Sequence, residues 1–386
     1  MSILHVAVKP RQRFACASAL GPLALIVMMP ALCASQKLVT FDAPNSSQSP
    51  LLGTEALAIN LWGTIVGDVT DNNGGVHGYL RTADGKFAEF DAPGANPSPG
   101  YPCLYVVGGT CPAAINDLGV IAGWEGDANG VFHGFVRTPD GKIAVFDAPG
   151  AGTASNQGTF AYAINNQGSV TGSYLDAGNV YHGFVRSADG NVLSFDSPEA
   201  GAGAYLGTEP ESISNRGEVA GSVVDANGFG HGFVRSADGK ITTFDPPGSA
   251  GSYYGTNVVY INDLGIVAGN YWQGTGNVSF GFEGIPSGII SAFQVPEAGT
   301  AAFEGAYMNA MNLEGTTVGY VTDSNVENHS FVRYANGQTN VFDVPGQMAV
   351  PGSDFGSGAY GINALGVVAG RWHDANVVLH AFIWAP

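Results

Sequence analysis

Charged side chains are scarce in this sequence, and positive ones are the scarcest. Only 12% of the 386 residues are charged, and 14 Lys and Arg stand against 32 Asp and Glu, which gives a formal net charge of −18. Nucleic acid and anionic membrane surfaces both repel a strongly negative protein, so we expect neither as a partner. After residue 35 the sequence also has no hydrophobic run long enough to span a membrane.

Familiar catalytic motifs are lacking as well. The sequence contains no Gly-x-Ser-x-Gly nucleophile elbow, no His-Glu-x-x-His metalloprotease motif, no phosphate-binding glycine loop and no dinucleotide-binding fingerprint. We therefore predict no catalytic residue and no resident cofactor.

Residues 1–35 have the pattern of a secretory signal peptide. Three basic residues precede an apolar run over 15–32, and small residues follow near Ala34, where we expect cleavage. The alternative is an uncleaved membrane anchor, and Cys33 leaves open whether the chain is lipidated. A cleaved signal peptide predicts an extracellular or periplasmic protein.

Cysteine is scarce, with four residues, and two of these lie in the first 35 positions. The other two, Cys103 and Cys111, lie in the longest connector between repeated segments, 94–112. In an exported protein such a pair is typical of a disulfide that holds a long loop. Free thiols or half of a metal site remain the alternative, although no His or Cys lies nearby in the sequence.

Glycine is abundant, and the sequence repeats itself. The segments 53–93, 158–198 and 207–247 are variants of one pattern, with 57 Gly in the whole chain and 11% aromatic residues. A period of roughly 50 residues with several short apolar runs indicates a repeat architecture. Many short strands joined by tight turns account for the glycine content.

One unit predicts four antiparallel strands. The strand candidates of the unit 158–198 are 160–164, 169–175, 182–187 and 191–196. Asn and Gly between the first two supply the positive φ that a hairpin turn needs, and Asp189-Gly190 joins the last two. A two-residue turn there predicts that Phe184 lies opposite Phe195 as an aromatic cross-strand pair.

Counting the turn after the first strand gives the number of units. An Ile-Asn-x-x-Gly turn, with single substitutions, begins at Ile59, Ile115, Ile164, Ile213, Ile261, Met311 and Ile362. Four antiparallel strands repeated around a ring form the blades of a β-propeller. The last unit has only three strands, and the segment 37–43 is an outer strand that no unit precedes. Pairing the two would remove an exposed sheet edge.

We therefore predict an all-β protein, a seven-bladed β-propeller of four-stranded antiparallel blades. The ring is closed by the N-terminal strand 37–43, which completes the last blade. Residues 36–386 form this single domain, and we expect a monomer.

Two polar positions recur in six of the seven units, as an Asp in the turn before the third strand and a His six residues later. These are Asp71, His77, Asp127, His133, Asp176, His182, Asp225, His231, Asp323, His329, Asp374 and His380. A second Asp ends the fourth strand, and the fifth unit loses all three at once, with Gln273, Phe280 and Gln294. The joint loss suggests that these groups hydrogen-bond to one another, although free drift of one unit explains it equally.

The recurring His and Asp have a structural and a functional interpretation. Buried polar groups need partners, so the His and Asp can brace each turn. Metal ligands or acid–base pairs are the alternative, but an active site is normally unique, and six near-identical copies favour structure. The turn Asp127-Ala-Asn-Gly130 is similar to the start of a calcium loop but lacks the acidic ligands that follow in one. Calcium therefore remains an alternative, and we predict no metal site.

The recurring His-Gly-Phe, with His-Ala-Phe at His380, is followed by Val-Arg and Asp-Gly. This motif resembles the bacterial extracellular HAF-type (His-Ala/Gly-Phe) repeat family, and the resemblance covers most of the chain after Lys37. It implies an exported repeat protein without an assigned activity, and it transfers no catalytic residue.

The long variable connectors share one end of the predicted propeller, where binding usually occurs on a rigid scaffold. The candidate ligand-binding residues there are Tyr101, Tyr205, Tyr253, Tyr254, Phe303, Phe355, Glu55, Glu209 and Glu304. Aromatic rings beside carboxylates suit a sugar or a cationic group. The alternative is that the rings only pack the loops onto the blades.

These observations predict a secreted binding or scaffold module whose ligand is a glycan, a peptide or a surface partner, without catalytic activity. The alternative is a lyase or hydrolase that acts on polysaccharide with carboxylates at the mouth of the central channel. A purely structural envelope protein is a third possibility. A unique converging pair among Glu55, Glu209, Glu211 and Glu304 would favour the enzyme.

Overall fold

A computed structural model describes residues 37–96, 108–249, 254–273, 277–348 and 355–386. The predicted signal peptide, 1–35, lies outside the described residues. Every regular element within the described ranges is a β-strand, so the all-β prediction is confirmed. Among the described residues there is no helix of the length and apolarity needed to cross a membrane.

The strands pair in antiparallel groups of four. In the unit 158–198, the strands that pair in chain order are β10 (Gly158–Ile164), β11 (Val170–Leu175), β12 (Tyr181–Arg186) and β13 (Val192–Phe195). The preceding groups are β2 (Ala58–Ile59), β3 (Ile65–Thr70), β4 (Val76–Arg81) and β5 (Phe87–Phe90), then β6 (Gly109–Ile115), β7 (Ile121–Gly126), β8 (Phe132–Arg137) and β9 (Ile143–Phe146).

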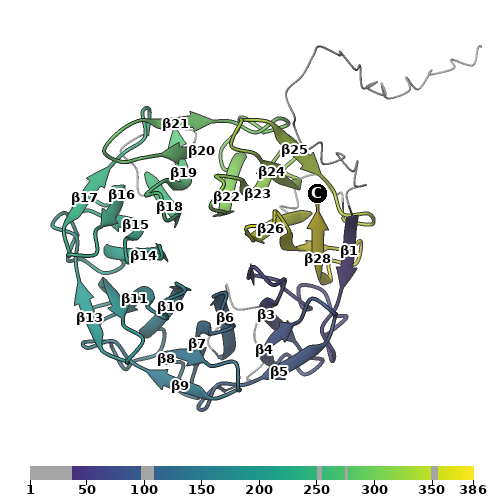
Figure 1. Cartoon of the computed structure of the whole chain (residues 1–386), viewed down its shortest axis with the longest axis horizontal. Coiled ribbons are helices and arrows are strands. Elements are labelled where there is room, and N and C mark those ends of the chain that lie inside the picture. The colour runs from purple at the N-terminus through teal and green to yellow at the C-terminus, as the bar shows by residue number, and fades with distance from the viewer. Residues whose placement is uncertain (1–36, 97–107, 250–253, 274–276, 349–354) are drawn as a thin grey trace, which may run out of the picture. The chain divides into compact units, whose positions relative to one another are not determined.

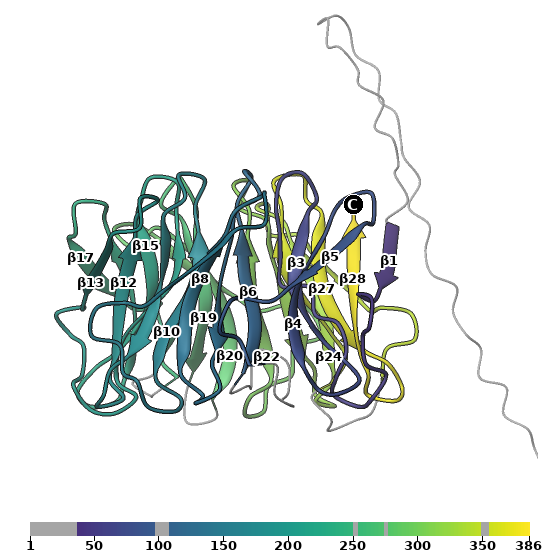
Figure 2. The ribbon, with the colours of Figure 1, turned by 90° about the horizontal axis from the view of Figure 1, so that it is seen from below.

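Three further groups follow the same order. They are β14 (Gly207–Ile213), β15 (Val219–Val224), β16 (Gly230–Arg235) and β17 (Ile241–Phe244), then β18 (Thr256–Ile261), β19 (Val267–Gln273), β20 (Val278–Gly284) and β21 (Ile290–Phe293), then β22 (Gly305–Met311), β23 (Thr317–Thr322), β24 (Asn328–Arg333) and β25 (Thr339–Phe342). Figure 1 shows the groups following one another around a central axis, with the first strand of each group nearest the axis. Figure 2 shows the strands running along this axis.

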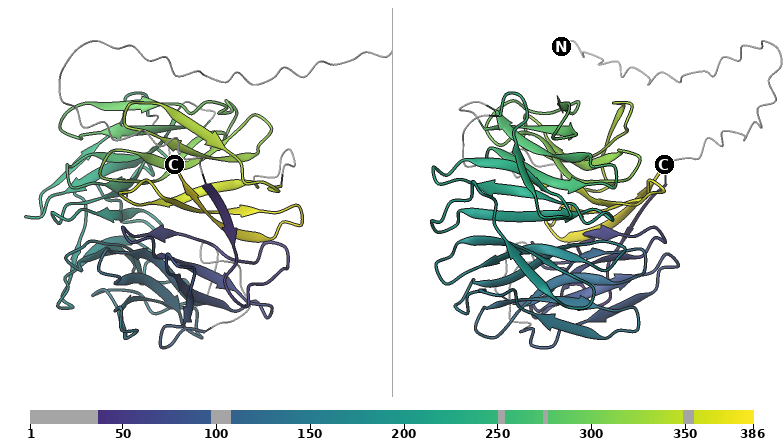
Figure 3. Two further views of the ribbon diagram at one scale, coloured as in Figure 1. Left: turned by 45° about the vertical axis from the view of Figure 1, so that its right-hand side comes forward. Right: turned by 60° about the vertical axis from the view of Figure 1, so that its left-hand side comes forward.

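The last group combines the two ends of the described chain. It contains β26 (Ser357–Ile362), β27 (Val368–His373), β28 (Leu379–Ala385) and the N-terminal β1 (Lys37–Phe41). β1 pairs antiparallel with β28, from Lys37 opposite Ala385 to Phe41 opposite Ala381 (Figure 3). The edge that β28 would otherwise expose is therefore covered by β1.

Adjacent groups are linked where each innermost strand begins. Three groups join into a 12-stranded sheet and two into an 8-stranded sheet, but each join is one parallel residue pair, such as Gly158 opposite Phe132 or Gly305 opposite Ser279. Gly158 has φ of 121°, and a Cβ there would collide with the backbone carbonyl of Phe132. Only glycine tolerates both the dihedral and the close approach.

We expect Gly158→Ala to lower the free energy of unfolding by roughly 1–3 kcal/mol, because the substitution strains φ and pushes two groups apart. Gly178→Ala is the matched control, since Gly178 lies in a surface turn of the same group and has no positive φ. Chemical denaturation of both variants tests the prediction, and equal stability would refute the tight join.

Each third strand buries one aromatic ring between groups. Phe184 is fully buried and meets Phe146 of the preceding group edge-on, with ring centroids 5.8 Å apart. The predicted pair of Phe184 and Phe195 is wrong, because Phe195 lies opposite Gly183. Three residues rather than two form the turn, and Gly190 has φ of 98°, which shifts the register by one. Phe195 instead packs against the next group.

Arginines of the third strands add a second contact between groups. In five groups the guanidinium lies over the Phe ring of the preceding group's outer strand, within 4.0–4.9 Å of its centroid. Arg81 lies over Phe41 of β1 in this way. Such cation–π contacts favour one fixed spacing between neighbouring groups.

Candidate functional site

The recurring His and Asp residues form the same arrangement in six groups. The imidazole Nδ1 of each His lies 2.7–3.0 Å from the Asp that follows the outer strand. The pairs are His77–Asp91, His133–Asp147, His182–Asp196, His231–Asp245, His329–Asp343 and His380–Asp42. The turn Asp, exemplified by Asp176, accepts the backbone N–H of Gly178 and Val180. In five of the six groups the Nε2 of the His also lies 3.5–3.9 Å from the turn Asp, which links the turn to the outer strand.

The fifth group replaces this arrangement by packing. Phe280, at the His position, stacks on Tyr271 with centroids 5.5 Å apart, and Gln294 donates to the carbonyl of Ser279. In the sixth group Asp323, Glu327 and His329 place ligand atoms within 4.8 Å of one another. Because Asp323 Oδ1 already accepts two backbone N–H groups, this cluster closes its turn like its counterparts, and we assign no metal there.

The predicted ligand-binding residues lie in different places. Tyr101 and Tyr253 lie outside the described residues, as does Cys103. Cys111 is buried in β6 rather than in the connector, and it is disulfide-bonded. Its pairing with Cys103 stays a prediction. Tyr205 is exposed in the loop before β14. Phe355 packs on His373, with ring centroids 4.7 Å apart.

Two of the predicted carboxylates serve the fold. Glu55 is fully buried and forms an ion pair with Arg371 of β27. Glu304 is 6% exposed, and its Oε2 accepts the N–H of Ala301 at 2.7 Å, which fixes its own loop. Neither carboxylate is placed to meet a ligand.

Three of the predicted residues, Tyr254, Phe303 and Glu209, do lie close together. They surround an aromatic hollow where β18 and β22 begin. The ring of Tyr254 lies 5.6 Å from Trp272 and 5.8 Å from Phe303, centroid to centroid. Trp272 in turn meets Tyr307 at 6.3 Å. Tyr254 and Trp272 line a cavity of about 250 Å³ together with Glu209 and Glu211. Phe303, Tyr307 and Tyr320 line a second cavity.

Carboxyl groups in this hollow have shifted pKa values. Burial raises the pKa of Glu209 to about 7. Burial, and then the neighbouring Glu209, raise the pKa of Glu211 to about 8. At neutral pH Glu211 is therefore mostly protonated and Glu209 about half protonated, and a protonated carboxyl offers a hydroxyl donor as well as an acceptor.

A further polar group in the hollow has no partner. The indole Nε1 of Trp272 is buried and meets no hydrogen-bond acceptor within the described part of the chain. Buried donors are normally satisfied, so an orphan donor in a cavity wall marks a place where a ligand oxygen can bind.

The sequence-based prediction missed Trp272, Tyr307 and Tyr320 because all three lie on strands, whereas binding residues were expected on the connectors. The sequence did hold one signal: the fifth unit lacks the recurring His and Asp, and the hollow borders the group that this unit forms. The innermost strands also contain β-bulges. Each of them from β6 onward has a register shift, and in β14 the shift falls between Pro210 and Ser212, at Glu211.

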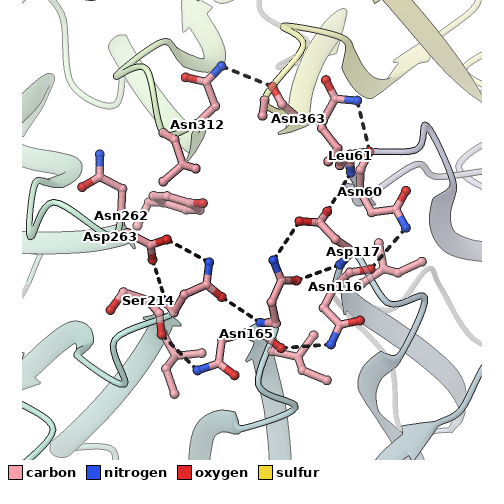
Figure 4. A pocket seen from close by; sticks show the side chains of 18 of the residues that line it. Asn60, Leu61, Asn116, Asp117, Asn165, Ser214, Asn262, Asp263, Asn312 and Asn363 are labelled. Carbon is pink, nitrogen blue, oxygen red and sulfur yellow. Dashed lines mark hydrogen bonds between the residues drawn. The ribbon is translucent and has the colours of Figure 1, made fainter.

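A second cavity, of about 240 Å³, lies around the axis where the innermost strands end (Figure 4). A ladder of Asn side chains surrounds it, and in five of them Nδ2 donates to the turn carbonyl of the next group. The links are Asn60 to Asn116, Asn116 to Asn165, Asn165 to Ser214, Asn312 to Asn363 and Asn363 to Asn60, at 2.9–3.2 Å. The last link joins the final group to the first.

Comparison with known proteins shows the fold alone. No protein-family model matches the sequence, and no curated protein matches it. A lectin from Burkholderia pseudomallei is similar over 88% of this chain and 98% of its own, with a TM-score of 0.54 and 12% identity. TolB from Acinetobacter baumannii covers 83% and 80% at TM-score 0.43 and 11% identity, and an Aleuria aurantia lectin 81% and 98% at 0.40 and 12%. The first similarity supports a β-propeller fold.

Proposed function

We propose that this chain is a secreted, seven-bladed β-propeller that binds carbohydrate in the aromatic hollow. The observation that carries the proposal is the orphan Nε1 of Trp272 in the wall of a cavity that also holds Glu209 and Glu211. An indole donor, two carboxyl groups with raised pKa and the ring of Tyr254 match a sugar, which offers hydroxyl groups at its edge and an apolar face.

The closed ring has independent support. The Asn363–Asn60 link and the Glu55–Arg371 ion pair connect the last group to the first, and the β1–β28 pairing completes the last group with the N-terminal strand. Together with seven four-stranded groups, these contacts favour seven blades in a closed ring. The HAF-type resemblance and the signal-peptide pattern favour export, which N-terminal sequencing of the exported protein tests directly: an intact residue 1 would contradict cleavage near Ala34.

The named function of the structural neighbour agrees with this proposal. The protein from Burkholderia pseudomallei is called a lectin. Because the identity is 12%, the argument for carbohydrate depends on the hollow itself.

Glu209 and Glu211 favour a second candidate, an enzyme that acts on polysaccharide. The two carboxyls line one cavity, and the charge of Glu209 raises the pKa of Glu211. A carboxyl group with a pKa near the working pH is suited to general acid–base catalysis of glycosidic bond cleavage. Release of shortened products from a bound polysaccharide would establish this function in place of simple binding.

We expect Trp272→Ala to reduce carbohydrate affinity at least about tenfold, because the variant loses both the indole donor and the aromatic wall. The measurement is an array of defined oligosaccharides probed with the full chain, followed by titration of each ligand found. Trp62→Ala is the matched control, since Trp62 is exposed at the opposite end of the innermost strands. Binding that survives Trp272→Ala, or an array without any ligand, would refute the hollow as the site.

A further inference from the structure

The cavity that the Asn ladder surrounds has an acidic residue on each of two opposite sides. Asp117, which follows β6, and Asp263, which follows β18, both line it, and Figure 4 shows their carboxylates across the cavity from each other. Asp117 Oδ1 accepts the N–H of Leu61 at 2.8 Å, and Asp263 Oδ2 accepts from the Asn215 amide at 2.9 Å. The carboxylates are thus held in place by neutral donors.

No Lys, Arg or His is among the residues that line this cavity in the described part of the chain. Arg216 is exposed in the turn that follows β14, at the same end. Tyr260, which also lines the cavity, is affected by these negative charges. Burial raises its pKa to about 12, and the charges of Asp263 and Asp117 add to the shift. Two negative charges in a partly enclosed space attract a cation that enters from solvent.

The ladder also has a gap that a ligand could fill. Asn262 is 2% exposed and lines the cavity, but its Nδ2 has no acceptor among the described residues, whereas five other ladder members donate to the next turn. Its Oδ1 is occupied by the N–H groups of Leu264 and Ile266. The free amide proton therefore calls for a carbonyl or hydroxyl oxygen.

Large apolar side chains stand exposed around this acidic well. They occupy the turn tips, two residues after the ladder position, and are Trp62 (68% exposed), Leu118 (66%), Leu264 (61%) and Leu365 (68%). Aliphatic side chains do not favour a sugar, and exposed apolar groups around a polar centre are typical of protein interfaces.

We infer that this end of the propeller binds a polypeptide partner that inserts an Arg or Lys side chain into the well between Asp117 and Asp263. A peptide carbonyl of the partner accepts from Asn262, and its apolar neighbours cover the leucines of the rim. The site is separate from the aromatic hollow, since the two lie at opposite ends of β18, and it does not depend on carbohydrate binding.

The test is calorimetric titration of the full chain with blocked Leu-Arg-Leu and with the same peptide carrying citrulline, a neutral isostere of arginine. We expect the arginine peptide to bind with a Kd below about 1 mM and the citrulline peptide at least about tenfold more weakly. Added salt should weaken only the arginine peptide. Equal affinity for the two peptides, or no binding up to about 5 mM, would overturn the inference.

Variants locate the site. Asp117→Asn with Asp263→Asn should weaken the arginine peptide at least about tenfold. Because these carboxylates also accept hydrogen bonds, Leu118→Ser with Leu264→Ser is a second variant that removes only exposed side chains and should weaken binding about threefold or more. Leu193→Ser, at an exposed leucine of the outer strand β13, and Trp272→Ala should bind as the parent does. Loss of binding with Trp272→Ala would place the peptide in the hollow and overturn the inference.

Discussion

Arg371→Met should lower the free energy of unfolding by about 3–5 kcal/mol, the usual cost of leaving one member of a buried ion pair without its partner. Glu55 is fully buried, Arg371 Nη1 pairs with its Oε1, and its Oε2 has no hydrogen-bond partner among the described residues. The variant therefore leaves a carboxylate that neither water nor protein stabilises. Burial lowers the pKa of Arg371 to about 10, which still leaves the guanidinium charged at neutral pH. The measurement is chemical denaturation at pH 7.

A double variant separates the ion pair from ordinary packing. Glu55→Leu with Arg371→Met replaces both charges by apolar groups of similar size, and we expect it to recover most of the lost stability. Arg216→Met, at an exposed turn, should change stability by less than about 0.5 kcal/mol. If the double variant were as unstable as Arg371→Met, the loss would come from packing rather than from the uncompensated charge, and the pair would not hold the ends together.

This ion pair illustrates what sequence reasoning could and could not reach. Local patterns predicted the strands, because alternating apolar residues and Asn-Gly or Asp-Gly turns specify hairpins over a few positions. They also predicted which ends of the chain pair, since the last unit lacked one strand. They did not reveal that Glu55 and Arg371 meet, because 316 positions separate them and nothing in either unit marks the other.

The sequence predicted the residue types that form the aromatic hollow, but not which residues of those types meet there. Tyr254 and Phe303 were candidates because connectors carry them, and Glu209 was a candidate because it lies near a connector; all three do lie around one hollow. Glu55 and Glu304 have the same residue type in the same part of the unit, yet one neutralises an arginine and the other caps its own loop. Burial and partners decide a carboxylate's role, and a single sequence does not state either. Trp272 was missed because a strand residue gave no reason to expect an unpaired donor.

Glu209→Gln with Glu211→Gln should raise stability at pH 8 and flatten its dependence on pH. In the unfolded chain both carboxyls ionise near their ordinary pKa of 4.5, whereas in the folded protein they stay protonated up to about 7 and about 8. Between these limits the folded state binds more protons, so the free energy of unfolding falls as pH rises, by about 1.4 kcal/mol per pH unit for each group at most. Below pH 4.5 both states are protonated and the substitutions should matter little.

Because the hollow is open to solvent, we expect a gain of at least about 2 kcal/mol at pH 8 rather than the full sum of the two shifts.

Glu125 is the matched control: burial raises its pKa to about 7 too, but it lies in β7, far along the chain from the hollow. Glu125→Gln should likewise flatten the stability profile, yet leave carbohydrate binding and its pH dependence as in the parent. The double variant should instead remove the loss of affinity that ionisation of the pair causes as the pH rises through 7 and 8. Thermal melting and carbohydrate binding measured from pH 4 to 9 distinguish these outcomes. If the double variant left the stability profile unchanged, Glu209 and Glu211 would be ionised in the folded protein. The hollow would then have neither the protonated donors of the carbohydrate proposal nor the general acid of the enzyme alternative.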